Sequence, residues 1–334
     1  MLVAFALLLA AAVAIYLSCE FFVNGIEWVG HRFGVSQTAT GSVLAAFGTA
    51  LPESVVTFVA VVFGKSPAET DLGVGAAIGG PLALSTLAYA VVGLVFITSA
   101  GTRSSGLFTA DTTHRLINDQ QWFLSIFMVK IVLGLIAFAV KPWLGLVFLA
   151  AYALYVRQEL QRTGDAESDH ETLEPLRIRR TDRNPAAVWA VLQTAGAVVV
   201  IFLASQLFVH QLAIIGPALG IPAQLVALLL SPIATELPEI LNAIIWVRQG
   251  KQNLALANIS GAMMIQATIP SALGLFFTPW LLGHALIWAA VITLLSIIGL
   301  YLLLRRNLLT GARLAWFGAL YLVFAAGLYF IPLQ

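Results

Sequence analysis

Two short motifs place carboxylates within stretches that are otherwise almost entirely apolar. Residues 48–53 read Gly-Thr-Ala-Leu-Pro-Glu, and residues 234–239 read Ala-Thr-Glu-Leu-Pro-Glu. In both motifs a glutamate directly follows a proline, which disturbs a helix. An ionisable group at lipid depth costs on the order of 3 kcal/mol and usually marks a functional site. We therefore interpret Glu53, Glu236 and Glu239 as parts of one cation site.

The prolines add backbone oxygens to the same neighbourhoods. A proline inside a helix has no N–H, so the carbonyl four residues earlier loses its partner. Pro52 thus frees the carbonyl of Gly48, and Pro238 frees that of Ala234. In lipid, such a carbonyl must be satisfied by protein, water or an ion. Ligand sets made only of oxygen favour hard cations such as Ca²⁺ or Na⁺ over Zn²⁺ or Cu²⁺.

Side-chain oxygens share the helix faces that carry these carboxylates. Thr49 lies four residues before Glu53, and Thr235 lies four residues before Glu239, so each pair lies on one face of its helix. Glu236 precedes Glu239 by three residues and shares roughly the same face.

A later apolar stretch adds two amide side chains, Asn258 and Gln266, and Pro270 frees the carbonyl of Gln266. The histidines show no metal-ligand spacing, and the sequence predicts no cofactor. The predicted ligands of the transported metal ion are Gly48, Thr49, Glu53, Ala234, Thr235, Glu236, Glu239, Asn258 and Gln266.

Composition indicates that the elements carrying these residues cross a membrane. Of the 334 residues, 60% are hydrophobic and only 10% are charged, and the mean hydropathy is +0.94. A spanning helix needs about 20 mostly apolar residues. We predict ten such helices, at residues 2–29, 36–63, 71–98, 122–140, 142–158, 185–211, 221–248, 252–277, 281–304 and 311–332.

One long polar stretch, 158–184, divides the chain into halves of five predicted helices, at residues 1–157 and 185–334. Cytoplasmic loops of membrane proteins hold an excess of Lys and Arg. If the N-terminus lies outside, all of the 17 Lys and Arg residues except Lys65, Lys130 and Lys141 fall on the inner side. We therefore expect a cytoplasmic linker and both termini outside, in the inner membrane of a prokaryotic cell.

The two halves repeat each other. Thr49 aligns with Thr235 and Glu53 with Glu239, an offset of 186 residues in both cases. Because five helices separate the copies, the repeats must enter the membrane from opposite faces. An inverted repeat of this kind places binding sites at the repeat interface near the middle of the bilayer. Beyond about four extra residues at 66–69 the offset falls to 182. The position that corresponds to Gln266 is therefore Leu84, so the predicted ligands are concentrated in the second half.

These features together resemble the cation/calcium exchanger superfamily, which includes sodium/calcium and proton/calcium antiporters. The motif at 48–53 is similar to the family's first-repeat signature, as are the preceding phrases at 21–23 and 33–36. The resemblance implies an all-α membrane protein of ten helices in two inverted five-helix repeats. It also implies that Thr49, Glu53, Thr235 and Glu239 coordinate ions.

The third and eighth predicted helices depart from the family pattern Gly-Asn-x-x-Gly-Ser-Asn. The first copy reads Gly-Ala-Ala-Ile-Gly-Gly-Pro at 75–81, and Gln266 holds the Asn or Asp position of the second copy. Glu236 replaces the small residue that usually follows the threonine. Since the lost residues are those of sodium-type sites, this departure favours protons as the counter-ion.

We interpret the protein as a secondary active antiporter, not an enzyme, that exchanges Ca²⁺ or a similar divalent cation for H⁺ or Na⁺. Crowded carboxylates cannot all stay ionised without cations, so metal and protons would alternate at one site. As the resemblance implies, the first and sixth helices would move against the rest.

Two alternatives stay open: a monovalent Na⁺/H⁺ exchanger, and a transport-inactive membrane protein with a regulatory or assembly role. Inorganic cations and the lipid bilayer are the expected partners, and nothing indicates nucleic acid.

Two further charged residues have open interpretations. Lys130 lies within the predicted helix at 122–140, where it can either snorkel to the membrane surface or pair with a carboxylate of the site as a built-in cation. Glu20, in the first predicted helix, can line an access path. The single cysteine, Cys19, excludes an internal disulfide.

Overall fold

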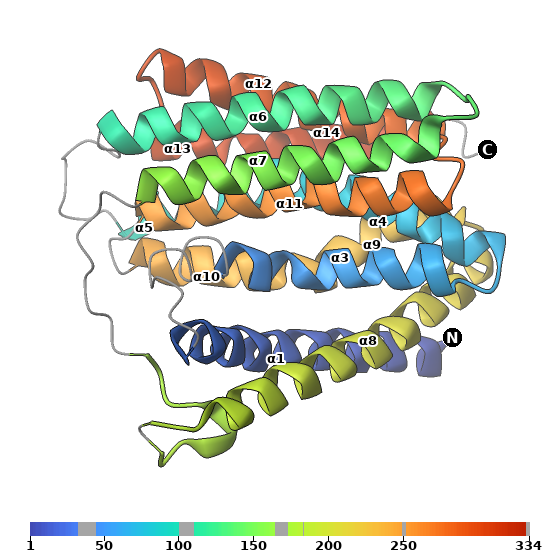
Figure 1. Ribbon diagram of the computed structural model, residues 1–334. Coiled ribbons are helices and arrows are strands. Elements are labelled where there is room, and N and C mark those ends of the chain that lie inside the picture. Colours follow the sequence, from blue (N-terminus) through green and yellow to red (C-terminus); the bar gives the residue numbers. More distant parts are fainter. Residues whose placement is uncertain (33–44, 100–109, 164–172, 183, 249–251, 332–334) are drawn as a thin grey trace.

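The chain folds into a bundle of helices, shown in Figure 1 as a computed structural model. The structure describes residues 1–32, 45–99, 110–163, 173–182, 184–248 and 252–331. Within these residues every regular element is helical and there is no strand. The all-α class predicted from composition is therefore confirmed.

Helices occupy all ten predicted segments. Those of the first half are α1 (Leu2–Arg32), α3 (Ala45–Phe63), α4 (Pro67–Ala83), the π-helical turn η2 (Leu84–Ala88), α5 (Tyr89–Ser99), α6 (Ala110–Leu135), the 3-10 turn η3 (Lys141–Leu144) and α7 (Gly145–Thr163). The second half contains α8 (Ala187–Ala218), α9 (Ala223–Thr235), α10 (Leu237–Arg248), α11 (Gln252–Phe277), α12 (His284–Arg305), α13 (Gly311–Ala315) and α14 (Phe317–Leu328). In the described residues, six helical stretches are long and apolar enough to cross a membrane.

Several boundaries differ from the sequence prediction, and the start of one predicted helix lies outside the described residues. The predicted helix at 221–248 is divided at Glu236 into α9 and α10, and the one at 311–332 is divided at Trp316. Helix α6 begins at Ala110 rather than near residue 122, and two polar residues of this added segment, Asp119 and Gln120, are buried. The first nine residues of the predicted helix at 36–63 lie outside the described residues.

Helices of the two halves pack reciprocally rather than as separate domains. Helix α3 packs against α11 and α4 packs against α9, while α1 and α8 lie side by side along one side of the bundle (Figure 1). In the predicted repeat, α3 corresponds to α9 and α10, and α4 corresponds to α11. Helix α3 therefore contacts the counterpart of α4, and α4 contacts part of the counterpart of α3. The N-terminus and the end of α14 lie at one end of the molecule, and the described linker residues 173–182 lie at the other.

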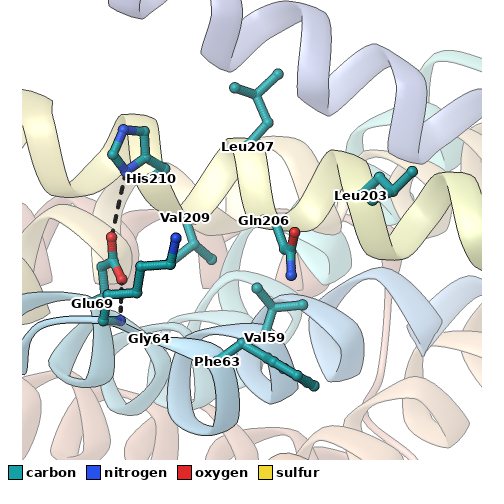
Figure 2. Close-up of a pocket in the computed structure, with 10 residues that line it drawn as sticks. Val59, Phe63, Gly64, Glu69, Leu203, Gln206, Leu207, Val209 and His210 are labelled. Atoms are coloured by element: carbon teal, nitrogen blue, oxygen red, sulfur yellow. Dashed lines mark hydrogen bonds and ion pairs between the residues drawn. The ribbon is translucent and has the colours of Figure 1, made fainter.

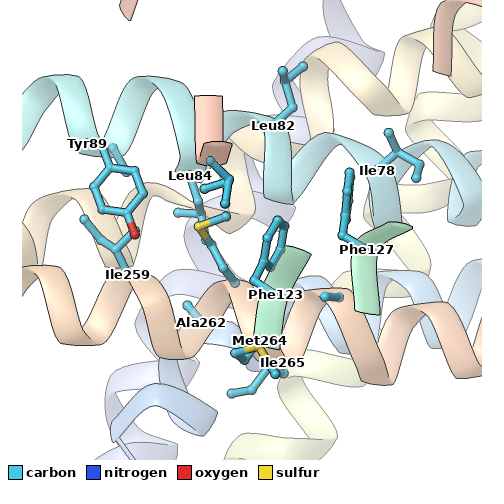
Figure 3. Packing of buried hydrophobic residues seen from close by; sticks show 14 of the residues in the cluster. Ile78, Leu82, Leu84, Tyr89, Phe123, Phe127, Ile259, Ala262, Met264 and Ile265 are labelled. Atoms are coloured by element: carbon cyan, nitrogen blue, oxygen red, sulfur yellow. The ribbon is translucent and has the colours of Figure 1, made fainter. Parts of the chain in front are cut away.

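An aromatic pair on α6 fixes the distance between α4 and α11. Phe123 and Phe127 stack with ring centroids 4.9 Å apart, and both are buried. Figure 3 shows the two rings between Ile78 and Leu82 of α4 and the residues of α11. Because close-packed interiors transmit strain and compress little, this cluster holds the two helices at a fixed separation.

The end of the linker is attached to α1 and α8. The Asn24 side chain accepts hydrogen bonds from the Arg177 backbone N–H at 2.9 Å and from the Gln193 amide at 3.0 Å, and it donates to the carbonyl of Glu174 at 3.4 Å. Leu176 is completely buried beside these contacts. The linker segment therefore connects the C-terminal end of α1 with the N-terminal end of α8.

We expect Asn24→Ala to destabilise this attachment. The substitution leaves buried donors without an acceptor, which costs about 1–3 kcal/mol. The change should lower the melting temperature in detergent and increase protease cleavage within the linker. Asn184→Ala is the control, because its side chain accepts from Arg32 in an exposed setting. Equal effects of the two substitutions would contradict the interpretation of Asn24 as the attachment point.

Candidate functional site

Two carboxylates, one from each half, meet in the interior of the bundle. Glu53 on α3 is 0% exposed, and Glu236, at the break between α9 and α10, is 1% exposed. Their charges lie close enough to interact. Two buried acidic groups this close cannot both stay ionised without a compensating cation.

The break at Glu236 follows from the prolines on either side. The Glu236 backbone N–H still donates to the carbonyl of Pro232 at 3.0 Å, and its own carbonyl accepts from Ile240 at 3.1 Å. Pro238 has no N–H and cannot pair with the carbonyl of Ala234. The helix is therefore interrupted at Glu236, and the side chain lies where α9 ends and α10 begins.

Both oxygens of Glu236 accept hydrogen bonds from other predicted ligands. The Thr235 hydroxyl donates to Oε1 at 3.0 Å, and the Gln266 amide of α11 donates to Oε2 at 2.8 Å. Thr235 and Gln266 are themselves buried. The structure thus brings Glu53, Thr235, Glu236 and Gln266 together, as the sequence predicts; their binding of an ion stays a prediction.

Several oxygens around this pair accept no hydrogen bond within the described part of the chain. They are both carboxylate oxygens of Glu53, the Gln266 Oε1 and the Ser231 hydroxyl. The hydroxyls of Thr235 and Ser231 lie beside Glu53, but neither donates to it in a normal hydrogen-bond geometry. Buried polar atoms are nearly always partnered. A group of unpartnered oxygens next to a carboxylate pair is therefore suited to a hard cation.

Ser231 is a site residue that the sequence analysis missed. It lies four residues before Thr235, on the same face of α9, and its side chain is 0% exposed. The spacing rule that paired Thr49 with Glu53 would have identified it one turn earlier.

Gly80 shows why α4 supplies space rather than a ligand. A Cβ atom at this position would lie 2.8 Å from the Gln266 Oε1 and 3.1 Å from the Glu236 Oε1. Both distances are shorter than ordinary van der Waals contacts. The absence of a side chain on α4 therefore makes room for the longer side chains that reach across from the second half.

The remaining predicted ligands are placed differently. Glu239 is fully buried on α10, near Cys19 of α1. Asn258 lies eight residues before Gln266 on α11, which is about 12 Å along the helix axis, too far for the two amides to share one ion. In the described residues, no group of three or more His, Cys, Asp and Glu is arranged to hold a metal ion. The roles of Glu239 and Asn258 as ligands stay predictions.

The first motif is described only in part. Gly48 and Thr49 lie in the first turns of α3, before Glu53, and Ala234 lies in the last turn of α9. The side chains of Thr49 and Ala234 lie outside the described part of the structure.

Lys130 and Glu20 occupy distinct settings. Lys130 is completely buried, which excludes the snorkelling interpretation, and its charge interacts with that of Glu53. Glu20 is partly exposed and forms an ion pair with Arg177 of the linker at 3.4 Å. A role of Glu20 in access stays a prediction.

A pocket of about 570 Å³ lies between α8 and the α3–α4 turn. Figure 2 shows His210 and Gln206 on α8 facing Glu69, Gly64 and Val59 across this space. His210 Nδ1 lies 3.4 Å from the Glu69 carboxylate at the rim. Val59 lies six residues after Glu53, about 9 Å along α3, so the pocket approaches the carboxylate pair along this helix.

A family model matches almost the whole chain. The model described as "Sodium/calcium exchanger protein" aligns with residues 3–158 and 189–331. The resemblance stated from the motifs is thereby confirmed. The gap between the two matched ranges contains the polar linker.

The chain is also similar to individual proteins over most of their length. The chain is 25% identical to the inner membrane protein YrbG of Escherichia coli (strain K12) over 336 residues, which covers 96% of this chain and 98% of that protein. The fold is similar to that of the H⁺/Ca²⁺ exchanger CAX, with a TM-score of 0.73 at 17% identity, covering 98% of this chain and 82% of that one. It is also similar to that of the sodium-calcium exchanger NCX_Mj, with a TM-score of 0.60 at 20% identity, covering 97% and 98%.

We expect Gly80→Ala to perturb the centre of the site. The added methyl group would collide with Gln266 and Glu236 and disturb their hydrogen bond, so the melting temperature in detergent should fall by a few degrees. Gly196→Ala is the matched control, because a Cβ atom there meets nothing within 4 Å and alanine favours a helix by about 1 kcal/mol over glycine. If Gly80→Ala is as stable as Gly196→Ala, the close packing described here is wrong.

Proposed function

Because the chain belongs to the sodium/calcium exchanger protein family, we propose that it is a secondary antiporter that exchanges Ca²⁺, or a similar divalent cation, for H⁺ or Na⁺. The observation that carries this proposal is the buried pair of Glu53 and Glu236, contributed by opposite halves and surrounded by oxygens that accept no hydrogen bond. Such a site binds positive charge in preference to any neutral solute.

The exchange would follow from competition for the same oxygens. A divalent cation between Glu53 and Glu236 compensates their charge and can take the Gln266 Oε1 and the hydroxyls of Thr235 and Ser231 as further ligands. When the metal leaves, protons or monovalent cations must take over this compensation. The site would therefore change from facing one side of the membrane to facing the other only when one kind of cation or the other is bound.

Access would alternate through movement of α1 and α8. These two helices pack along one side of the bundle and are joined by the end of the linker. The α3–α4 turn, which lines the pocket beside α8, lies at the same end of the molecule as the N-terminus (Figure 1). We propose ten spans in two inverted halves, with the termini outside the cell, so that this pocket is the outer entrance.

The composition of α4 favours protons over Na⁺ as the counter-ion. Gly79 and Gly80 offer no side-chain oxygen, and Leu84 stands where α11 has Gln266. Protons need only the carboxylates already present, whereas Na⁺ needs several further oxygen ligands. The inner membrane location of YrbG in Escherichia coli supports a similar location for this protein.

Transport in reconstituted vesicles tests the proposal. We expect ⁴⁵Ca²⁺ uptake driven by an imposed pH gradient or Na⁺ gradient. Glu53→Gln and Glu236→Gln should lower uptake at least about a hundredfold, because each substitution removes one of the two carboxylates that compensate the charge of the divalent cation. We expect the same of Glu239→Gln from its place in the motif.

Glu174→Gln is the matched control for this assay, because the Glu174 side chain is 76% exposed in the linker; it should transport like the wild type. Absence of gradient-driven ⁴⁵Ca²⁺ flux in the wild type would contradict the proposal. Flux of Na⁺ against H⁺ without Ca²⁺ would instead identify a monovalent exchanger, and absence of all flux a transport-inactive protein.

The pH dependence of uptake distinguishes the counter-ions. If protons compete with the metal, lowering the pH on the Ca²⁺ side should raise the half-saturating Ca²⁺ concentration, by up to about tenfold per pH unit for each proton displaced. The effect should be present without Na⁺. A half-saturating concentration that responds to Na⁺ but not to pH would assign Na⁺ as the counter-ion.

A further inference from the structure

Lys130 is a buried cation that the mechanism above does not use. It lies on α6, its side chain is 0% exposed, and its ammonium Nζ lies 5.2 Å from the ring centre of Phe127 and 5.8 Å from that of Trp280. The Trp280 indole N–H donates to the Lys130 carbonyl at 3.2 Å and fixes this part of α6. A charge held in so apolar a setting is costly unless it is compensated.

A carbonyl freed by proline holds the ammonium group in place. Pro81, inside α4, has no N–H to pair with the carbonyl of Ala77, four residues earlier. Lys130 Nζ donates to this carbonyl at 2.6 Å. The contact therefore provides the partner that Pro81 removes, and it links α6 to α4 one turn from Gly80.

This position brings the ammonium group into the electrostatic range of Glu53. Glu53 in turn interacts with Glu236. The carboxylate pair thus has an ammonium group beside it that is attached to the protein, and this attached charge cannot leave with the transported ions. At an effective dielectric constant of about 20, a unit charge several ångströms away changes the binding of a second charge substantially.

We propose that Lys130 is a tethered counter-ion of the ion site: it supplies one of the positive charges that balance Glu53 and Glu236, and it weakens the binding of the divalent cation so that the cation can be released. The inference rests on the proposed function. A monovalent cation bound beside Glu53 would have the same charge, so Lys130 takes the place of one such ion. The residue sets the charge of the site and is not itself a ligand of the metal.

Equilibrium binding of ⁴⁵Ca²⁺ to the purified protein in detergent at neutral pH tests this role. Lys130→Met should bind Ca²⁺ more tightly, on the order of tenfold or more, because the site gains one net negative charge. Lys130→Arg keeps the charge and should bind like the wild type. In vesicles, Lys130→Met should show a lower half-saturating Ca²⁺ concentration and a lower maximal rate, because release becomes slow.

Lys141 offers a matched control. It is a second buried lysine that donates to backbone carbonyls, those of Ile136, Pro279 and Trp280 at 2.7–2.8 Å, but it lies in the turn between α6 and α7. Lys141→Met removes a buried ammonium group without changing the charge beside Glu53. We expect no change in Ca²⁺ affinity, so any gain in Lys130→Met reports the charge and not the loss of a buried lysine.

The outcomes separate this inference from the proposed function. If the wild type binds no Ca²⁺, the proposed function fails and the inference fails with it. If the wild type binds Ca²⁺ and Lys130→Met binds it equally or more weakly, or if Lys130→Arg behaves like Lys130→Met, only the inference fails. If Lys130→Met does not fold, the double variant Lys130→Met with Glu53→Gln, which removes both charges, should recover folded protein; failure to recover would also overturn the inference.

Discussion

Burial of charge in an apolar interior is the constraint on which the rest of the structure depends. Glu53, Glu236 and Lys130 are all buried, where an isolated charge costs several kcal/mol. The surrounding helices are arranged to compensate them: Thr235 and Gln266 donate to Glu236, while Lys130 approaches Glu53. The oxygens around Glu53 stay without a hydrogen-bond partner in this arrangement, and exchange of cations is the function that we propose for them.

Proline produces the local irregularities of this interior. Pro81 frees a carbonyl that accepts a hydrogen bond from Lys130. Pro238 lies two residues after Glu236, where the helix is interrupted between α9 and α10. The two copies use the same residue type differently, because α3 continues through Pro52 whereas the second copy divides into α9 and α10. A hydrophobic chain thus obtains polar backbone atoms in its interior without exposing them to lipid.

The two halves contribute unequally to a site that their reciprocal packing makes common to both. Helix α11 supplies Gln266, whereas the corresponding helix α4 supplies only the space at Gly80. The long Gln266 side chain of α11 occupies space beside Gly80 of α4, which has no side chain. The second half can therefore hold most of the proposed ligands while α4 and α11 keep their close contact.

The sequence by itself determined the all-α class, the approximate segments and the carboxylates at its centre, because apolar stretches and misplaced charges are local properties of the chain. Spacing along one helix also predicted that Thr235 lies beside the acidic residues. Only the tertiary structure decided which residues meet across helices: it brought Gln266 to Glu236, Gly80 beneath both and Lys130 toward Glu53, while Glu239 lies near Cys19. Those contacts depend on the packing and rotation of separate helices, which no spacing within a single segment specifies.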